Sequence, residues 1–225
     1  VPPKPTLPVI LDLATKWRWG MAMLKTQRRT FRNIVGHVEG VTNTADLAMW
    51  AAEMFDPKLN WDDIAWIKDR WGGKIILKGI LDPEDAVEAT KYGCDALIVS
   101  NHGGRQLDGA LSTIEALPGI VDAVSDKIEI HIDSGIRSGQ DIFKAIAMGA
   151  KSTYIGRAYI YGLGAMGETG VTTALDVIRK ELDTTMALCG ETNIGDVTDG
   201  KECQSDPVLR VNHHLFSRLL YFGAV

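Results

Sequence analysis

The side chains best suited to chemistry lie in one short run, Ser100-Asn101-His102-Gly103-Gly104-Arg105-Gln106-Leu107-Asp108. The imidazole of His102 titrates near neutral pH and can act as a general base. The planar guanidinium of Arg105 can bind a carboxylate through two hydrogen bonds. Gly103 and Gly104 permit a sharp turn and a close approach of the backbone to a ligand. The other interpretation is a loop whose histidine caps a strand end and whose arginine forms a surface ion pair. The whole nonapeptide favours the functional interpretation.

A second run, Asp133-Ser134-Gly135-Ile136-Arg137-Ser138-Gly139-Gln140-Asp141, is followed further along by Gly156 and Arg157. Gly135 and Gly156 can offer backbone N–H groups to an anion, and the two arginines Arg137 and Arg157 supply positive charge. In parallel α/β barrels, the loops after the last two strands and a nearby helix N-terminus form such a phosphate site. This motif is less specific than the first, because similar loops bind phosphate in other barrels. It predicts a phosphate-bearing ligand.

Strands and helices must alternate to position these two runs. Short apolar segments indicate strands at Lys74–Leu77, Ala96–Val99, Ile128–Ile132 and Ser152–Ile155. Amphipathic or well-capped segments indicate helices at Thr44–Met54, Asn60–Trp71, from Asp82 onward, Ser112–Val124, Ser138–Met148 and Thr169–Leu188. Continuous apolar strands separated by helices are typical of a parallel sheet that is covered by helices.

The predicted fold class is α/β, a (β/α)8 TIM barrel of which this chain supplies about the C-terminal half, strands 5 to 8. Polar and glycine residues follow each predicted strand, at Lys78-Gly79, Ser100–His102, Asp133–Gly135 and Gly156-Arg157. In a barrel these strand ends form one functional face. In an open sheet the site would concentrate at one switch point instead. The expected segments are residues 1–42, a basic aromatic loop, residues 43–190, the half barrel, and residues 191–225, a tail.

The composition of the chain argues against several classes of function. The 225 residues are 45% hydrophobic and carry a net charge of −5, which suits one α/β domain and argues against nucleic-acid binding. The three cysteines lack metal-type spacing, so we expect a reducing compartment. His213 and His214 could bind a metal, but a surface tail or subunit contact is the preferred interpretation, and no metal is expected. No run is long and apolar enough to predict a transmembrane helix.

The basic aromatic segment interrupts this acidic chain. Residues 13–38 contain six lysines and arginines and no Asp or Glu, with Trp17, Trp19 and Phe31 interleaved. Such a pattern suits the surface of an anionic membrane, with indole rings at headgroup depth. A basic loop that covers the active site or packs on a neighbouring subunit is the alternative, because the apolar residues show no clear helical period.

The nonapeptide resembles the active-site signature of the FMN-dependent 2-hydroxy-acid dehydrogenases and oxidases. Within that family, Phe55–Pro57, Trp61, Trp66 and Lys78–Ala86 are most similar to the bacterial membrane-associated L-lactate dehydrogenases. The resemblance implies that His102 takes the substrate hydroxyl proton, that Arg105 holds the substrate carboxylate and that Lys78 lies near N1 and O2 of the flavin. We expect the residues that contact FMN to be Lys78, Ser100, Asp133, Ser134, Gly135, Arg137, Gly156 and Arg157.

The implied reaction is oxidation of an L-2-hydroxy acid, foremost L-lactate to pyruvate, with electrons passed to a quinone or another membrane carrier. The alternatives are an oxidase that uses O2 and a truncated noncatalytic subunit that binds phosphate or flavin. The implied location is peripheral, on the cytoplasmic face of the inner membrane, and relatives commonly form tetramers. The chain departs from the family twice: Ser134 replaces the glycine of the usual Asp-Gly-Gly, and the N-terminal half of the barrel, expected as a partner, is not in this sequence.

Overall fold

The computed structural model describes residues 6–25, 34, 37–41, 44–54 and 56–197. The chain divides into two compact units, residues 1–60 and residues 61–225, which are described separately. His213, His214, Cys203 and most of the predicted tail lie outside the described residues. The predicted segment boundaries at residues 42 and 190 stay predictions.

The first unit is helical where it is described. Its helices are α1 (Leu7–Thr15), α2 (Trp17–Lys25) and α3 (Thr44–Glu53). Helix α3 agrees with the prediction, but the basic aromatic segment, expected as a loop, contains α1 and α2. Residues without branching at Cβ, such as Met21, Ala22 and Leu24, form helix readily. Trp17 and Trp19 lie two positions apart and so fall on different helical faces, which explains why the sequence shows no clear helical period.

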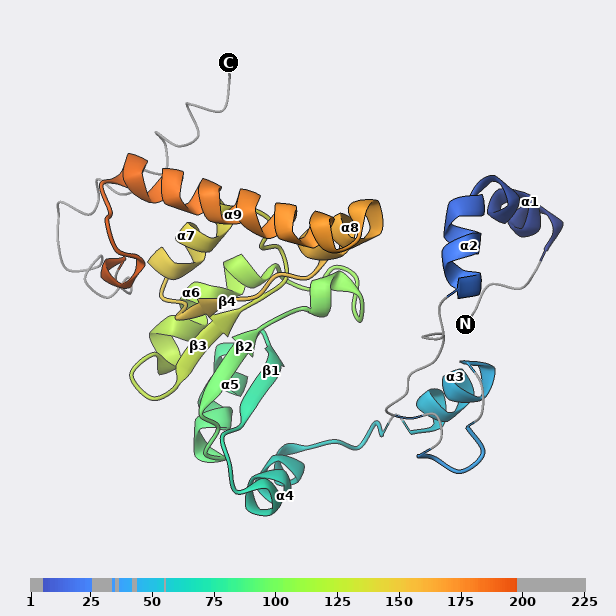
Figure 1. The fold of residues 1–225 in the computed structure, drawn as a ribbon. Coiled ribbons are helices and arrows are strands. Elements are labelled where there is room, and N and C mark those ends of the chain that lie inside the picture. Colours follow the sequence, from blue (N-terminus) through green and yellow to red (C-terminus); the bar gives the residue numbers. More distant parts are fainter. Residues whose placement is uncertain (1–5, 26–33, 35–36, 42–43, 55, 198–225) are drawn as a thin grey trace. The chain divides into compact units, whose positions relative to one another are not determined.

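The second unit is built on a four-stranded parallel sheet (Figure 1). Its strands are β1 (Ile76–Ile80), β2 (Ala96–Val99), β3 (Glu129–Ile132) and β4 (Ser152–Thr153). They pair in the sequential order β1-β2-β3-β4, with no reversal. A doubly wound sheet reverses its strand order at the switch point. The sequential order therefore agrees with the predicted half of a (β/α)8 barrel.

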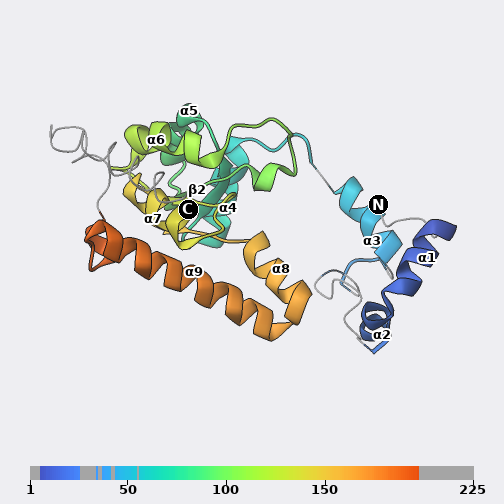
Figure 2. The same ribbon diagram turned by 90° about the horizontal axis from the view of Figure 1, so that it is seen from above.

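One helix, α4 (Trp61–Trp71), precedes β1, and at least one helix follows every strand. The helices that follow are α5 (Pro83–Lys91) after β1, α6 (Thr113–Val124) after β2, α7 (Gly139–Ala147) after β3, and α8 (Arg157–Met166) and α9 (Glu168–Cys189) after β4. Short 3₁₀ turns occur at η1 (His102–Gly104) and η2 (Ile194–Asp196). The long helix α9 runs along α7 and α8 (Figure 2). Helix α8 was not predicted, because its start has no capping side chain and its sequence includes two glycines.

Strand β1 differs from the prediction in a way that matters for the site. It was expected to end at Leu77, but it continues through Ile80, so Lys78 lies within the strand. Gly79 has a φ of 106°, and the pairing with β2 shifts between Lys78 and Ile80. Glycine tolerates this conformation, and a bulge of this kind re-aims a strand where it approaches a site.

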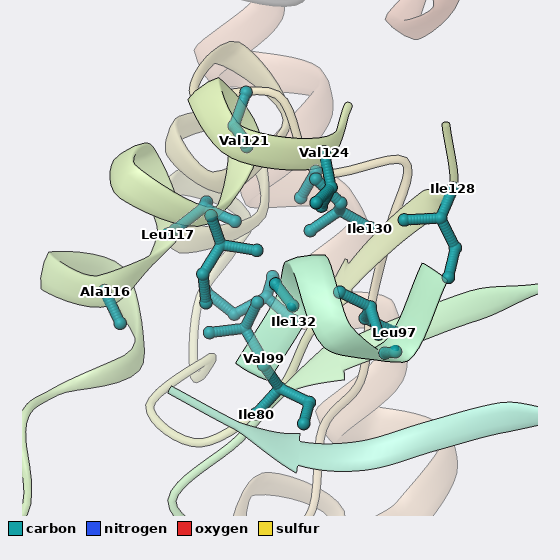
Figure 3. Close-up of a cluster of buried hydrophobic side chains, with 14 of the residues drawn as sticks. Ile80, Leu97, Val99, Ala116, Leu117, Val121, Val124, Ile128, Ile130 and Ile132 are labelled. Carbon is teal, nitrogen blue, oxygen red and sulfur yellow. The ribbon is translucent and has the colours of Figure 1, made fainter. Parts of the chain in front are cut away.

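The core lies between the sheet and the helices that cover one of its faces (Figure 3). Leu97, Val99, Ile130 and Ile132 are each at most 1% exposed and pack with Leu117 of α6. Because side chains alternate along a strand, this packing directs the intervening residues to the opposite face of the sheet. The alternation of hydrophobic residues along the strands thereby determines which polar side chains can meet on the sheet face opposite the helices.

The contact between α7 and α9 leads to a testable prediction. A Cβ atom at Gly139 would overlap the backbone amide of Leu182 in α9, whereas one at Gly164 in α8 would meet nothing within 4 Å. Gly139→Ala should therefore lower the free energy of unfolding by about 1–3 kcal/mol, because overpacking forces backbone shifts. The matched control Gly164→Ala should leave it unchanged or raise it by up to about 1 kcal/mol. Urea denaturation measures both, and equal midpoints would contradict the described packing.

Candidate functional site

One cavity of about 520 Å³ opens where the strands of the second unit end. Polar side chains that follow parallel strands meet at this edge of a sheet. All the predicted site residues except Ser100 line this cavity, namely Lys78, His102, Arg105, Asp133, Ser134, Gly135, Arg137, Gly156 and Arg157. The structure thus brings together the two sequence motifs and the lysine of β1.

Lys78 is held at the cavity wall by two partners. Its Nζ lies 2.6 Å from Oδ2 of Asp133, which follows β3, and donates a 2.6 Å hydrogen bond to Oγ of Ser100, which follows β2. Burial by itself would raise the pKa of Asp133, but hydrogen bonds from Lys78, Ser100 and Ser134 outweigh it and hold this pKa below its usual value. Ser100 is only 2% exposed and lies behind the cavity wall, where it supports Lys78.

The loop that carries His102 has an unusual backbone. His102 has a φ of 56°, and Gly103 and Gly104 each have a φ of 69°. A non-glycine residue in this left-handed region is uncommon and needs support from its surroundings. Two neighbours in the chain provide it: Oγ of Ser100 accepts a 3.1 Å hydrogen bond from the amide of His102, and Oδ1 of Asn101 accepts one from the amide of Gly104.

Two residues distant in sequence hold Gly103 from both sides. Its amide donates a 3.0 Å hydrogen bond to Oγ of Ser134, and its carbonyl accepts one of 2.9 Å from Nη2 of Arg157. Arg157 begins α8, so the loops after β2, β3 and β4 are connected at this glycine. Arg157, predicted as a phosphate ligand, therefore also contacts the loop of His102.

The start of α8 offers the most suitable place for a phosphate. Helix α7 begins with a capping box in which Ser138 and Asp141 satisfy each other's backbone amides, and Asp141 also accepts from the amide of Arg137. Helix α8 begins after Gly156, which lines the cavity, and no side chain caps its first N–H groups. Uncapped N–H groups at a helix start, together with arginines nearby, bind anions. The N-terminus of α8 fits the predicted role better than that of α7.

Several cavity residues have no counterpart among the predicted ones. Tyr154, Ile155 and Ile160 line the cavity from β4 onward, and their proximity to Gly156 in sequence was the available signal. Oγ1 of the 1% exposed Thr113 lies 2.7 Å from the carbonyl oxygens of both Asp133 and Ser134, which share its one proton. No sequence pattern pointed to Thr113, because a threonine that starts a helix is common.

The charge of the cavity suits an anionic ligand. Lys78, Arg105, Arg137 and Arg157 line it, and Asp133 is the one carboxylate among the lining residues. A concave surface with an excess of one charge concentrates ligands of the opposite charge. Among the described residues, no group of His, Cys, Asp and Glu could hold a metal ion. The site therefore combines an imidazole, four cationic side chains and a pocket of cofactor size.

Comparison with known proteins places this chain in a family. A family model described as FMN-dependent dehydrogenase matches residues 1–203. An L-lactate dehydrogenase of Actinobacillus pleuropneumoniae serotype 5b (strain L20) is 46% identical over 182 residues, which cover 81% of this chain and 48% of that protein. An L-lactate dehydrogenase of Pectobacterium atrosepticum is 48% identical over 183 residues, 81% of this chain and 47% of that protein.

Solved structures agree. The monotopic membrane protein (S)-mandelate dehydrogenase superposes with a TM-score of 0.82 at 35% identity, over 88% of this chain and 52% of that one. Mandelate oxidase gives a TM-score of 0.63 at 40% identity, over 69% of this chain and 45% of that one. The chain thus spans about half the length of these relatives, and the half-barrel fold is confirmed. The resemblance inferred from the nonapeptide is likewise confirmed: the chain belongs to the FMN-dependent dehydrogenase family.

Proposed function

We propose that the complete protein oxidises an L-2-hydroxy acid, most specifically L-lactate to pyruvate, with FMN as its cofactor. The observation that carries this proposal is the convergence of Lys78, His102 and Arg105 on one cavity with the phosphate-binding elements. The names of the relatives, L-lactate dehydrogenases at 43–48% identity, support lactate as the substrate.

The residues present fit FMN. The phosphate would lie between the guanidinium groups of Arg137 and Arg157 at the N-terminus of α8, where Gly135 and Gly156 leave open space. Gly135 has a φ of 114°, a conformation that side chains disfavour. Lys78 would be the residue that contacts the flavin ring. When bound, FMN supplies the acceptor for the hydride that leaves the substrate.

The chain's own groups would bind the substrate and move its proton. Arg105 pairs with the carboxylate of the hydroxy acid, which fixes the orientation of the molecule. His102 accepts the hydroxyl proton as general base. Lys78, oriented by Asp133 and Ser100, places an ammonium where negative charge develops on reduction. Asp133 and Ser134 then act on this lysine and on the loop rather than on the substrate.

The N-terminal half of the barrel is expected to close the cavity from the side opposite the helices of this chain. The half barrel leaves one sheet face uncovered by its own helices in the second unit, and we propose that an N-terminal half of the barrel covers it and completes the substrate pocket. A quinone or another membrane carrier as electron acceptor, and assembly into a homo-tetramer, belong to the same proposal. An oxidase that uses O2 is the alternative outcome of the assay below.

The first unit supports a membrane contact. In α2, Trp17 is 66%, Trp19 54% and Leu24 71% exposed, next to the basic residues Lys16 and Lys25. Exposed indoles beside cations suit the interface of an anionic bilayer. The monotopic mandelate dehydrogenase lends support from a relative. None of the described helices is both long enough and apolar enough to cross a bilayer. We therefore propose peripheral binding, at the cytoplasmic face of the inner membrane.

The reaction is tested by flavin absorbance. The purified complete gene product should carry FMN, and anaerobic L-lactate should bleach it. His102→Gln should retain bound flavin and lose turnover by roughly 10³-fold, because the general base is missing. Quinone reduction should exceed peroxide release if the protein is a dehydrogenase, whereas rapid peroxide release would identify an oxidase. Flavin that L-lactate leaves oxidised in the unaltered protein would refute the proposed reaction.

Membrane binding is tested with vesicles. Trp19→Ala should lower binding to phosphatidylglycerol vesicles by roughly tenfold, because the indole no longer inserts at the interface. Trp66→Ala is the matched control, since Trp66 is also 63% exposed but belongs to the second unit. Co-sedimentation measures both variants. Equal losses in the two variants, or equal binding to neutral phosphatidylcholine, would speak against the proposed contact.

The ion pair of Lys78 and Asp133 predicts a pH-dependent stability. Asp133→Asn should lower the free energy of unfolding of the flavin-free protein at pH 7 by about 1–3 kcal/mol, as for a hydrogen bond to a charged group. Because the pKa of Asp133 is lowered on folding, this difference should be complete above about pH 4. It should vanish as the pH falls through the lowered pKa of the folded protein. Asp176→Asn on an exposed position of α9 is the control, and a difference that persists at low pH would contradict the assignment.

A further inference from the structure

The backbone at Ser134 has a conformation that its residue type disfavours. Ser134 has a φ of 65°, and it and His102 are the two non-glycine residues with positive φ in the described part of the chain. Left-handed backbone is strained for a residue with a Cβ atom. Glycine at this position would relieve the strain, so a serine there needs a compensating interaction.

The hydroxyl of Ser134 supplies interactions that glycine could not. It donates a 2.6 Å hydrogen bond to Oδ1 of Asp133 and accepts the 3.0 Å bond from the amide of Gly103. Asp133 in turn pairs with Lys78 through its other oxygen. One hydroxyl thus connects the loop that carries His102 to the ion pair that orients the lysine.

The turn around Ser134 is itself fixed from behind. Oγ1 of buried Thr113 lies 2.7 Å from the carbonyl oxygens of both Asp133 and Ser134, and its one proton, shared between them, restrains the peptide that joins the two residues. The hydroxyl at position 134 is therefore presented from a rigid point. The partner that it holds, Gly103, directly follows His102, whose own left-handed backbone needs external support.

We infer that Ser134 is a positioning residue, whose hydroxyl holds the His102 loop in register with the Lys78–Asp133 pair. The inference rests on the proposed function for the meaning of that register, since His102 acts there as the base. It gives Ser134 a different task from the cofactor contact that the motif suggested. The one proton of the hydroxyl and one of its two acceptor lone pairs are used within the protein.

Two substitutions separate the hydroxyl from the strain. Ser134→Ala removes the hydroxyl and keeps a Cβ atom at positive φ, whereas Ser134→Gly removes both. Turnover should follow the hydroxyl, so kcat with L-lactate should fall about tenfold in both variants, the effect of about one hydrogen bond on a transition state. The KM for L-lactate and the flavin content should stay within about twofold, because Arg105 and the phosphate site are untouched.

The melting temperature should depend on the backbone strain at position 134 and not on the hydroxyl. Ser134→Gly should melt about 2–4 °C above Ser134→Ala, because glycine relieves the left-handed strain. If Ser134 were only structural, turnover would follow the melting temperature, and the glycine variant would be the more active of the two. Ser125→Ala is the matched control: the buried hydroxyl of Ser125 has no hydrogen-bond partner among the described residues, and its loss should change neither kcat nor flavin content.

Hydrogen exchange supplies a readout that does not depend on turnover. The amide of Gly103 should exchange faster in both Ser134 variants than in the unaltered and Ser125→Ala proteins, with flavin bound and without it. Mass spectrometry of the peptide that covers residues 101–107 measures this. Unaltered exchange, or a glycine variant with full kcat, would overturn the inference. If the unaltered protein fails to oxidise L-lactate, the proposed function is wrong, and the exchange result still decides whether Ser134 holds the loop.

Discussion

The ion pair between Lys78 and Asp133 joins the middle of β1 to the end of β3 across β2, and the site depends on this link. Ser100, at the end of the intervening strand, completes it from behind. The pair can form only if all three strands send these residues to the same face. That requirement is met because Leu77, Leu97 and the isoleucines of β3 occupy the helix-covered face. Hydrophobic packing on one side of the sheet thus determines the electrostatics of the other.

Most of this arrangement was accessible from the sequence. The strands at 96–99 and 128–132 were predicted almost to the residue, because continuous apolar runs between turn-forming residues leave few alternatives. The gathering of His102, Arg105 and the loop at 133–137 on one cavity followed from the rule that barrel loops meet at one end. The two motifs therefore located the cavity before any contact between their side chains was known.

Other features depended on contacts that no local pattern encodes. The extension of β1 through Ile80 requires a bulge at Gly79, which depends on the pairing with β2. Helix α8 lacks a capping signal, and in α2 the aromatic residues Trp17 and Trp19 lie two positions apart, so they do not share one helical face. Ser134 was noted as a departure from Asp-Gly-Gly, but only its distance to Gly103 gives that departure a structural meaning.

The close contact between α7 and α9 connects α9 to the site, although no residue of α9 is among those that line the cavity. Gly139, the first residue of α7, packs on the backbone near Leu182 and donates its amide to Oε2 of Glu181 at 3.0 Å. The loop that carries Arg137 leads directly into that glycine. Helix α9 consequently restrains the anion-binding loop. Residues more than forty positions downstream limit how far this wall of the cavity can move.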